Sequence, residues 1–409
     1  MGKTRKTIVV LATLDTKAEE ALYLKELIKK RGHNPLVMDI GTSRDHSVHA
    51  DFTNEELAQA IGRSLEEIRA GVDHYPEVLM ALSTGGQKII QDLLSQGKID
   101  GLLSVGGGIG TVAAIKIMRE LPLTIPKLAL STLAFVGTYT FDMVSLDQTM
   151  MQSVADLYGI NRITKISLQR AAGAICGMAE AHEDKGETAE DKRPVVAITA
   201  LGVLHYVDRV QSLLLEKGYE PVPFHTAGSY AMEKMVRWGY FSGVLDLCAY
   251  ELVNHVCGGI IKEGEEEKYT SACVKGIPQV IAPGALDFFP LLASAGLPNK
   301  VKERSRILHG PVYLIKSTPK EQEEIASRMA ERINKTTGPI AVLIPLKGFS
   351  NLDRNKETPF YDPGAGRRLS GLLKEKVASS LVEIEEIDAH INDPAFAERA
   401  TALLLSRLG

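Results

Sequence analysis

The sequence lacks several features that would indicate a membrane or nucleic-acid-binding protein. It has no apolar run of about eighteen residues, the length that a membrane-spanning helix needs. Its net charge of −4 argues against nonspecific binding to nucleic acid. The N-terminal residues lead directly into a predicted strand instead of a signal-peptide core. We therefore expect a cytoplasmic protein with no membrane and no nucleic-acid partner.

Cysteine is also scarce, and the few cysteines do not have the Cys-x-x-Cys spacing of common zinc sites. Each lies among apolar residues, so we expect reduced, buried thiols and no structural zinc. The four cysteines are Cys176, Cys248, Cys257 and Cys273.

What the sequence does contain is a repeated alternation of strand and helix patterns. Its 409 residues exceed what one core usually organises, and a polar stretch at residues 181–192 reads as a linker. The alternation is typical of βαβ units. We predict an α/β fold of two Rossmann-like three-layer subdomains with mostly parallel sheets, residues 1–180 and 193–409, the first binding a nucleotide. Predicted strands span residues 7–13, 35–40, 99–105, 127–131, 194–199, 221–225, 243–247, 278–282, 312–315, 340–344 and 381–387.

The first predicted turn joins the strand 7–13 to a helix at residues 17–30 and carries groups suited to a phosphate. Thr13 and Thr16 offer hydroxyl donors, and Lys17 offers a cation. A helix N-terminus adds unpaired N–H groups and a favourable dipole. Asp15 has two interpretations that the sequence leaves open: it caps the helix, or it positions magnesium or a water molecule.

A glycine run lies between the strand 99–105 and a predicted helix at residues 111–121. Without Cβ atoms, its backbone can approach a ligand closely. The alternative interpretation is that the glycines only allow the helix to pack on the strand. Together with the first turn, this region predicts a nucleotide site. The residues predicted to contact the nucleotide in this region are Gly106, Gly107, Gly108, Gly110, Thr111 and, at the end of the next strand, Ser131 and Thr132.

Two further predictions concern helices. Gly85 and Gly86 lie within one helical stripe of apolar residues between 78 and 94, so we interpret them as a site of close packing or a kink, not as a phosphate loop. Residues 54–70 form a single predicted helix that begins at Thr53 or Asn54.

Polar residues also follow the predicted strands of the second half. Ligands of open parallel sheets bind beyond the carboxyl ends of the strands. If the protein is an enzyme, four residues there would handle a small acidic substrate in a cleft between the domains. The alternative is that they cap helices, form turns or pack in the core. The four are His225, Asp246, Asp287 and Lys347.

Seven short motifs, in order along nearly the whole chain, carry a family resemblance. Together they resemble the family of ATP-binding domains similar to the N-terminal part of the tomato tobamovirus-resistance protein, whose members are mostly uncharacterised bacterial and fungal proteins. The resemblance implies two α/β subdomains, ATP bound by the N-terminal one, and a homodimer. It leaves any protein partner unidentified. The motifs span residues 13–17, 105–111, 121–127, 159–163, 245–247, 284–287 and 345–350.

The sequence therefore favours a protein that binds ATP, with magnesium at Asp15, or a related phosphorylated nucleotide. A first alternative is an ATP-dependent enzyme that acts on a small carboxylated or phosphorylated metabolite. A second is an NAD-dependent oxidoreductase. We rank it last, because the strand after the glycine turn ends in Ser131 and Thr132, without the acidic residue that grips a ribose in such enzymes.

Overall fold

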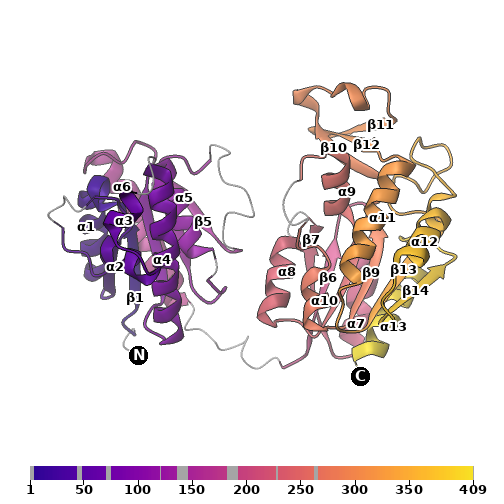
Figure 1. Ribbon diagram of the computed structural model, residues 1–409, viewed down its shortest axis with the longest axis horizontal. Helices are drawn as coiled ribbons and strands as arrows, with labels where there is room; N and C mark the ends of the chain where they lie inside the picture. The colour runs from indigo at the N-terminus through magenta and orange to yellow at the C-terminus, as the bar shows by residue number, and fades with distance from the viewer. Residues whose placement is uncertain are drawn as a thin grey trace. The chain divides into compact units, whose positions relative to one another are not determined.

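The protein forms two compact units, residues 1–191 and 192–409, and each is described by itself (Figure 1). The computed structural model describes residues 4–43, 48–70, 75–119, 121–135, 146–181, 192–226, 229–261 and 266–408. Most of the predicted linker, residues 182–191, lies outside the described residues. Within these ranges, none of the helices is long and apolar enough to cross a membrane.

The N-terminal unit is built on a five-stranded parallel sheet in the order β2-β1-β3-β4-β5. Its strands alternate their side chains between two apolar layers, so Ile8 and Val10 face one layer while Val9 and Leu11 face the other. The strands are β1 (Thr7–Ala12), β2 (Asn34–Asp39), β3 (Gly101–Gly106), β4 (Lys127–Ser131) and β5 (Thr149–Gln152).

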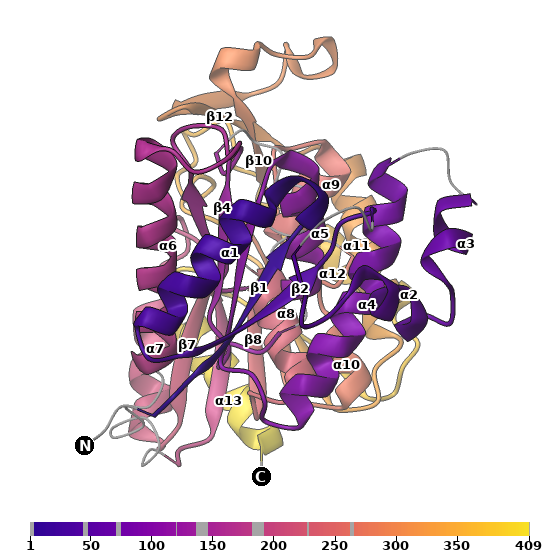
Figure 2. The same cartoon turned by 90° about the vertical axis from the view of Figure 1, so that its left-hand side faces the viewer.

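Helices cover both faces of this sheet, which makes the unit a three-layer α/β sandwich (Figure 2). One face packs against α1 (Leu14–Lys30) and α6 (Arg162–Ala181). The other packs against α2 (Asn54–Ala60), α3 (Leu65–Ala70), α4 (Tyr75–Ser95) and α5 (Gly108–Met118).

Three helix predictions for this unit are wrong in their bounds. The single helix predicted for residues 54–70 is divided into α2 and α3, because Gly62 adopts a positive φ of 76° after α2. The helices after β1 and β3 begin three residues earlier than predicted, at Leu14 and Gly108. The first candidate turn and most of the glycine run therefore belong to the first turns of helices.

The C-terminal unit contains a six-stranded parallel sheet in the order β14-β13-β9-β8-β6-β7. Its strands are β6 (Val195–Ala200), β7 (Glu220–His225), β8 (Gly243–Cys248), β9 (Gln279–Gly284), β13 (Ile340–Pro345) and β14 (Val382–Ile387). All six match predicted strands to within two residues at each end. Both units therefore have the predicted Rossmann-like α/β fold.

Helices again pack on both faces of the sheet. The first face packs against α7 (Val207–Glu216) and α13 (Pro394–Leu408). The second packs against α9 (Tyr250–Cys257), α11 (Pro319–Ile333) and α12 (Ala365–Lys376). A smaller cluster next to β6 is formed by α8 (Ser229–Trp238) and α10 (Thr270–Lys275).

The predicted strand at residues 312–315 is present as β12 (Val312–Lys316), but it lies outside the parallel sheet. It pairs antiparallel with β10 (Phe288–Leu292) and β11 (Arg306–His309) in a separate three-stranded sheet. This sheet projects from one end of the unit (Figure 1). The connection between β10 and β12 contains no helix long enough for a parallel crossover, so the antiparallel arrangement follows.

Candidate functional site

The candidate nucleotide site lies where β1 and β3 run side by side in the N-terminal sheet. Ala12, at the end of β1, is paired with Val105, so the turns that follow the two strands are neighbours. The chain leaves β1 toward β2 on one side and leaves β3 toward β4 on the other. This is the switch point of strand order at which open α/β sheets bind ligands.

The turn after β1 is a compact helix start at Thr13, the N-cap of α1. The main-chain oxygen of Thr13 accepts hydrogen bonds from the N–H groups of Thr16 (3.0 Å) and Lys17 (2.8 Å). The hydroxyls of Thr13 and Thr16 lie 2.8 Å apart. The interpretation that Asp15 caps this helix is wrong, because Asp15 is already inside the helix and its carboxylate turns toward another loop.

Asp15 and Asp39 bind main-chain N–H groups around the end of β2. Asp15 Oδ2 accepts from the N–H of Thr42 at 2.9 Å, and Asp39 Oδ1 accepts from the N–H groups of Leu14 (3.1 Å) and Gly41 (2.8 Å). The two carboxylates lie close together, since a Cβ on Gly41 would be 3.0 Å from both Asp15 Cγ and Asp39 Oδ1.

One oxygen of these two carboxylates accepts no hydrogen bond from the described residues. Asp15 Oδ1 is buried and has no hydrogen-bond partner in the part of the chain that the structure describes. Burial, followed by the charges of Asp15 and Asp39, raises the pKa of Tyr75 to about 12. No group of three or more metal-ligating side chains occurs among the described residues. A magnesium ion at Asp15 would therefore rely on water and phosphate oxygens for its other ligands.

Lys17 is the other candidate residue of this turn, and its environment is unusual for a lysine. Only 9% of its surface is exposed. Its ammonium donates to the main-chain oxygen of Thr16 at 3.2 Å, and no carboxylate within the described ranges forms an ion pair with it. An ammonium has three N–H donors, so at least two remain for another acceptor. Its backbone departs from helical geometry, with φ −129° and ψ 25°.

The glycine turn after β3 presents main-chain N–H groups. Gly107 is the N-cap of α5, and no side chain caps the helix there. The first main-chain hydrogen bond of α5 runs from the N–H of Thr111 to Gly107 O at 2.9 Å. The N–H groups of Gly108 to Gly110 precede this bond, so they have no acceptor within the helix. The two candidate turns lie close together, because a Cβ on Gly110 would be only 3.5 Å from Thr13 Cγ2.

Thr111, Ser131 and Thr132 hold this turn against β4. The buried hydroxyl of Thr111 donates to Gly107 O at 2.7 Å and lies 2.9 Å from Ser131 Oγ. The N–H of Thr132 donates to Gly106 O at 3.3 Å, and its hydroxyl is 3.9 Å from where a Cβ of Gly107 would lie. In this arrangement Thr111 and Ser131 support the turn, whereas the hydroxyl of Thr132 lies beside it.

In the C-terminal unit, Asp246 belongs to a buried charge cluster. The ammonium of Lys268 lies 2.7 Å from Asp246 Oδ1 and 3.2 Å from Glu251 Oε2, and all three side chains are almost completely buried. Burial raises the pKa of Asp246 to about 6, although Lys268 lowers it. Burial alone would lower the pKa of Lys268, but Asp246 and Glu251 outweigh it and raise that pKa. Lys268 is therefore held as a cation.

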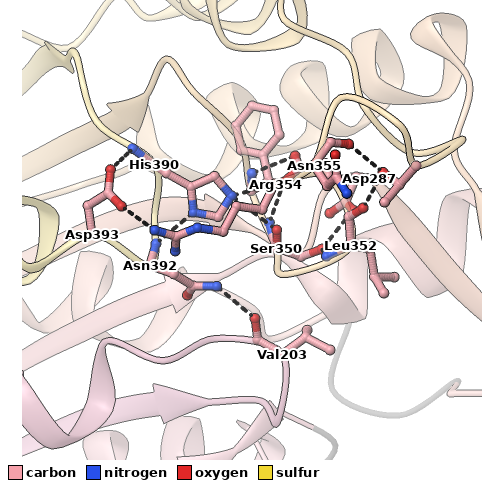
Figure 3. A network of polar contacts seen from close by, with 12 residues as sticks. Val203, Asp287, Ser350, Leu352, Arg354, Asn355, His390, Asn392 and Asp393 are labelled. Atoms are coloured by element: carbon pink, nitrogen blue, oxygen red, sulfur yellow. Dashed lines mark hydrogen bonds and ion pairs between the residues drawn. The ribbon is translucent and has the colours of Figure 1, made fainter.

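Asp287 belongs to a different buried network, which joins the loops after β9, β13 and β14 (Figure 3). The Ser350 hydroxyl donates to Asp287 Oδ2 at 2.7 Å. Asp353 accepts from the N–H of Phe349 at 2.7 Å and lies 3.1 Å from His390 Nε2. Burial, followed by the charge of Asp353, raises the pKa of Asp287 well above its ordinary value.

This network contains serine, histidine and aspartate, but it is not arranged as a nucleophilic triad. The N–H of Asn392 donates to His390 Nδ1 at 3.0 Å, so in the neutral ring the proton is on Nε2. That nitrogen faces Ser350 O and Asp353 Oδ1, both at 3.1 Å, and not the Ser350 hydroxyl. Ser350 is also fully buried. The network therefore stabilises the three loops.

The remaining two candidates of this unit lie elsewhere on the sheet edge. The ammonium of Lys347 is exposed and bonds to the main-chain oxygen (2.8 Å) and carboxylate (3.0 Å) of Asp388. His225 is exposed at the end of the edge strand β7, so it does not pack in the core. Asp246, Asp287 and Lys347 thus each have a different partner, and these contacts do not join them into one cluster.

The sequence reasoning missed Lys268, Glu233 and Asp39. Lys268 and Asp39 are described above, and Glu233 on α8 accepts from the N–H groups of Tyr269 (2.7 Å) and Ser271 (2.9 Å) at the start of α10. Asp39 carried a usable signal, because it is the next-to-last residue of the strand predicted for residues 35–40. No pattern in the sequence indicates that Lys268 and Glu233 are buried, since charged residues in polar segments normally face water.

Glu233 gives a testable pH dependence. Burial raises its pKa from 4.5 to about 7, although hydrogen bonds with Ser271 oppose this. The raised pKa makes its contribution to stability complete below pH 4.5 and lost as the pH rises through 7. We expect the free energy of unfolding to fall by about 3 kcal/mol from this group between pH 4.5 and 8.

Urea unfolding at several pH values, followed by the fluorescence of Trp238, measures this slope. Trp238 is the single tryptophan and lies on α8 in the same unit. Glu233→Gln is expected to remove this part of the slope. Glutamine has only one accepting oxygen for the two N–H groups, so the variant should be less stable than the wild type near pH 4.5, and this difference should shrink as the pH rises to 8. Parallel curves for the wild type and the variant would contradict the assignment.

Comparison with known proteins identifies a family and several proteins that are similar to this chain. Profiles of the N-terminal and C-terminal domains of the uncharacterised protein family (UPF0261) match residues 6–184 and 193–408. A UPF0261 protein of Clostridium tetani is 36% identical over 400 residues, 96% of each chain. A UPF0261 protein of Brucella suis is 30% identical over 97% of this chain and 94% of its own length.

The relationship to the tomato protein that the motifs predicted is confirmed. The ToMV susceptible protein tm-1(GCR26) of Solanum lycopersicum is 28% identical over 95% of this chain and 54% of its own length. Among solved structures, UDP-GlcNAc 2-epimerase from Neisseria meningitidis bound to UDP-GlcNAc matches 68% of this chain and 82% of its own, with 14% identity and a TM-score of 0.24.

Proposed function

This chain belongs to the uncharacterised protein family UPF0261, and we propose that its N-terminal unit binds the phosphates of a nucleotide, with ATP as the first candidate. The phosphates would lie between the turns that follow β1 and β3. The N–H groups at the start of α5 would donate to phosphate oxygens, as helix N-termini commonly do.

The observation that carries this proposal is the burial of Lys17 without an acidic partner. Removing an ammonium from water is unfavourable unless an anion or several acceptors replace the water. Within the described residues, Lys17 has one main-chain acceptor and no carboxylate partner. It lies in the turn that is close to the glycine turn at Gly110. A bound phosphate would supply the missing negative charge.

The unpaired oxygen of Asp15 supports magnesium as a companion of the nucleotide. A buried carboxylate oxygen without a hydrogen bond is a strong acceptor, and Mg²⁺ in nucleotide sites is commonly held by one or two carboxylates together with phosphate oxygens and water. Asp15 would hold the ion, and Thr132 would donate its hydroxyl to the phosphates beside Gly107.

Calorimetric titration of ATP with magnesium tests the proposal on the wild type, Lys17→Met and Lys30→Met. Lys30 is exposed at the other end of the same helix, so its variant is the matched control. We expect Lys17→Met to weaken binding by about ten- to a hundredfold, because a hydrogen bond to a charged group contributes about 1.5–3 kcal/mol. Lys30→Met should bind like the wild type.

The stability of Lys17→Met separates loss of a ligand contact from loss of structure. Removing a buried ammonium that has no acidic partner leaves no buried counter-charge behind, so the unliganded variant should be as stable as the wild type or more so. Wild-type affinity for ATP in Lys17→Met, or no affinity in the wild type, would refute the proposal.

The enzyme alternative gains no support from the positions of His225, Asp246, Asp287 and Lys347, because the contacts of the last three lead to different partners. An assay of ATP turnover with an added carboxylated or phosphorylated metabolite would test this alternative on the same protein. The homodimer and the cytoplasmic location also stay predictions, which light scattering and cell fractionation would test.

A further inference from the structure

A pocket of about 440 Å³ opens beside the first turn of α1. Its volume lies in the range of small-molecule sites, roughly 300–1,000 Å³. One wall comes from α1 and the other from the loop after β5. The lining residues that matter here are Thr16, Glu19, Glu20, Tyr158 and Gly159.

Tyr158 is the most notable side chain of this pocket, because 89% of its surface is exposed. Large aromatic side chains normally bury most of their ring, and an exposed one beside a cavity indicates a contact surface. Its position is fixed by the next residue. Gly159 has a positive φ of 78°, and its N–H donates to the buried carboxylate of Glu20 at 2.9 Å. The loop therefore holds Tyr158 at the pocket without covering its ring.

The opposite wall carries Glu19, whose carboxylate has no hydrogen bond or ion pair within the described residues. A Cβ on Gly159 would lie 3.5 Å from Glu19 Oε2, so this carboxylate borders the Tyr158 loop. Carboxylates repel phosphate but accept hydrogen bonds from hydroxyl groups, as they do for the ribose of bound dinucleotides. The pocket thus suits an aromatic ring and hydroxyls, and not a phosphate.

The pocket lies next to the proposed phosphate site, because they meet at the first turn of α1. Thr16 lines the pocket, and its hydroxyl is 2.8 Å from that of Thr13. Thr13 in turn lies close to the glycine turn, since a Cβ on Gly110 would be 3.5 Å from Thr13 Cγ2. One ligand with a nucleoside joined to a phosphate chain could therefore occupy both.

We infer that this pocket binds the nucleoside of the nucleotide, with the base stacked on Tyr158 and the ribose hydroxyls donating to Glu19. The inference rests on the proposed phosphate site. It assigns recognition of the nucleoside to the pocket and recognition of the phosphates to Lys17 and the glycine turn.

Titration of ATP and of inorganic tripolyphosphate, both with magnesium, separates the two parts. The wild type should bind ATP at least about tenfold more tightly than tripolyphosphate, because stacking of a base on an aromatic ring and hydrogen bonds to the ribose add to the phosphate contacts. Tyr158→Ala should lose about tenfold in affinity for ATP and keep the wild-type affinity for tripolyphosphate. Tyr158→Phe should keep both affinities.

Tyr240→Ala is the matched control, since Tyr240 is a partly exposed tyrosine of the C-terminal unit. Because Tyr158 is exposed, its replacement should not change the unfolding temperature. Equal affinity of the wild type for ATP and tripolyphosphate, or unchanged ATP affinity in Tyr158→Ala, would overturn this inference alone. Failure of the wild type to bind either ligand would overturn the proposed phosphate site and this inference with it.

Discussion

Lys268→Met is expected to destabilise the C-terminal unit by about 3–5 kcal/mol, the usual loss when one partner of a buried ion pair is removed. The variant leaves Asp246 and Glu251 buried without their cation. Because the pKa of Asp246 is already about 6, the loss should be smaller at pH 5 than at pH 8, where the carboxylate stays charged.

Urea unfolding followed by Trp238 fluorescence measures this loss in the full chain, because Trp238 lies in the affected unit. Lys335→Met serves as the control. Lys335 forms an exposed ion pair with Glu331 at 3.4 Å, and such pairs contribute about 0–1 kcal/mol. A loss below about 1 kcal/mol for Lys268→Met would mean that water or another group compensates the two carboxylates.

Gly85→Ala is expected to destabilise the N-terminal unit by about 3 kcal/mol, the upper part of the range for overpacking. Gly85 lies in the middle of α4, where this helix crosses α2. An added Cβ would come within 1.8 Å of the main-chain oxygen of Leu57, and neither backbone can move without displacing its helix. The predicted role of this glycine, close packing inside a helix, is consistent with this contact.

Gly177→Ala is the matched control for a helical glycine. Gly177 is exposed on α6, and a Cβ there would meet nothing within 4 Å. This variant should be about 0.5–1 kcal/mol more stable than the wild type, because alanine favours the helix. Thermal unfolding followed by circular dichroism compares the two. A Gly85→Ala protein as stable as Gly177→Ala would show that α2 and α4 can separate at low cost.

Most strands could be predicted from the sequence because their signal is local. Short apolar runs with β-branched residues identified β1, β4, β8 and β13 to within about a residue. Strand partners are not local, and for this reason β12 was assigned to a parallel sheet that it does not join. Helix starts also depend on distant groups, since Asp39 binds the N–H of Leu14 and thereby helps α1 begin before Asp15.

The residues of the N-terminal candidate site could be found from the sequence, because the turns after β1 and β3 are fixed by strand order. Their individual roles could not. Thr111 looked like a ligand contact, but its hydroxyl bonds to Gly107 and Ser131. In the second unit, the sequence analysis did not single out Lys268, because its burial and its two partners depend on β8 and α9 folding around it.

The raised pKa values of Glu233 and Asp287 have a calorimetric consequence. Both carboxyls hold protons in the folded state at pH values where the unfolded chain has released them. Folding of the C-terminal unit near pH 6 therefore takes up protons from the solution. The heat of unfolding measured at that pH will include the heat of ionisation of the buffer, so phosphate and imidazole buffers should give different enthalpies for the same transition.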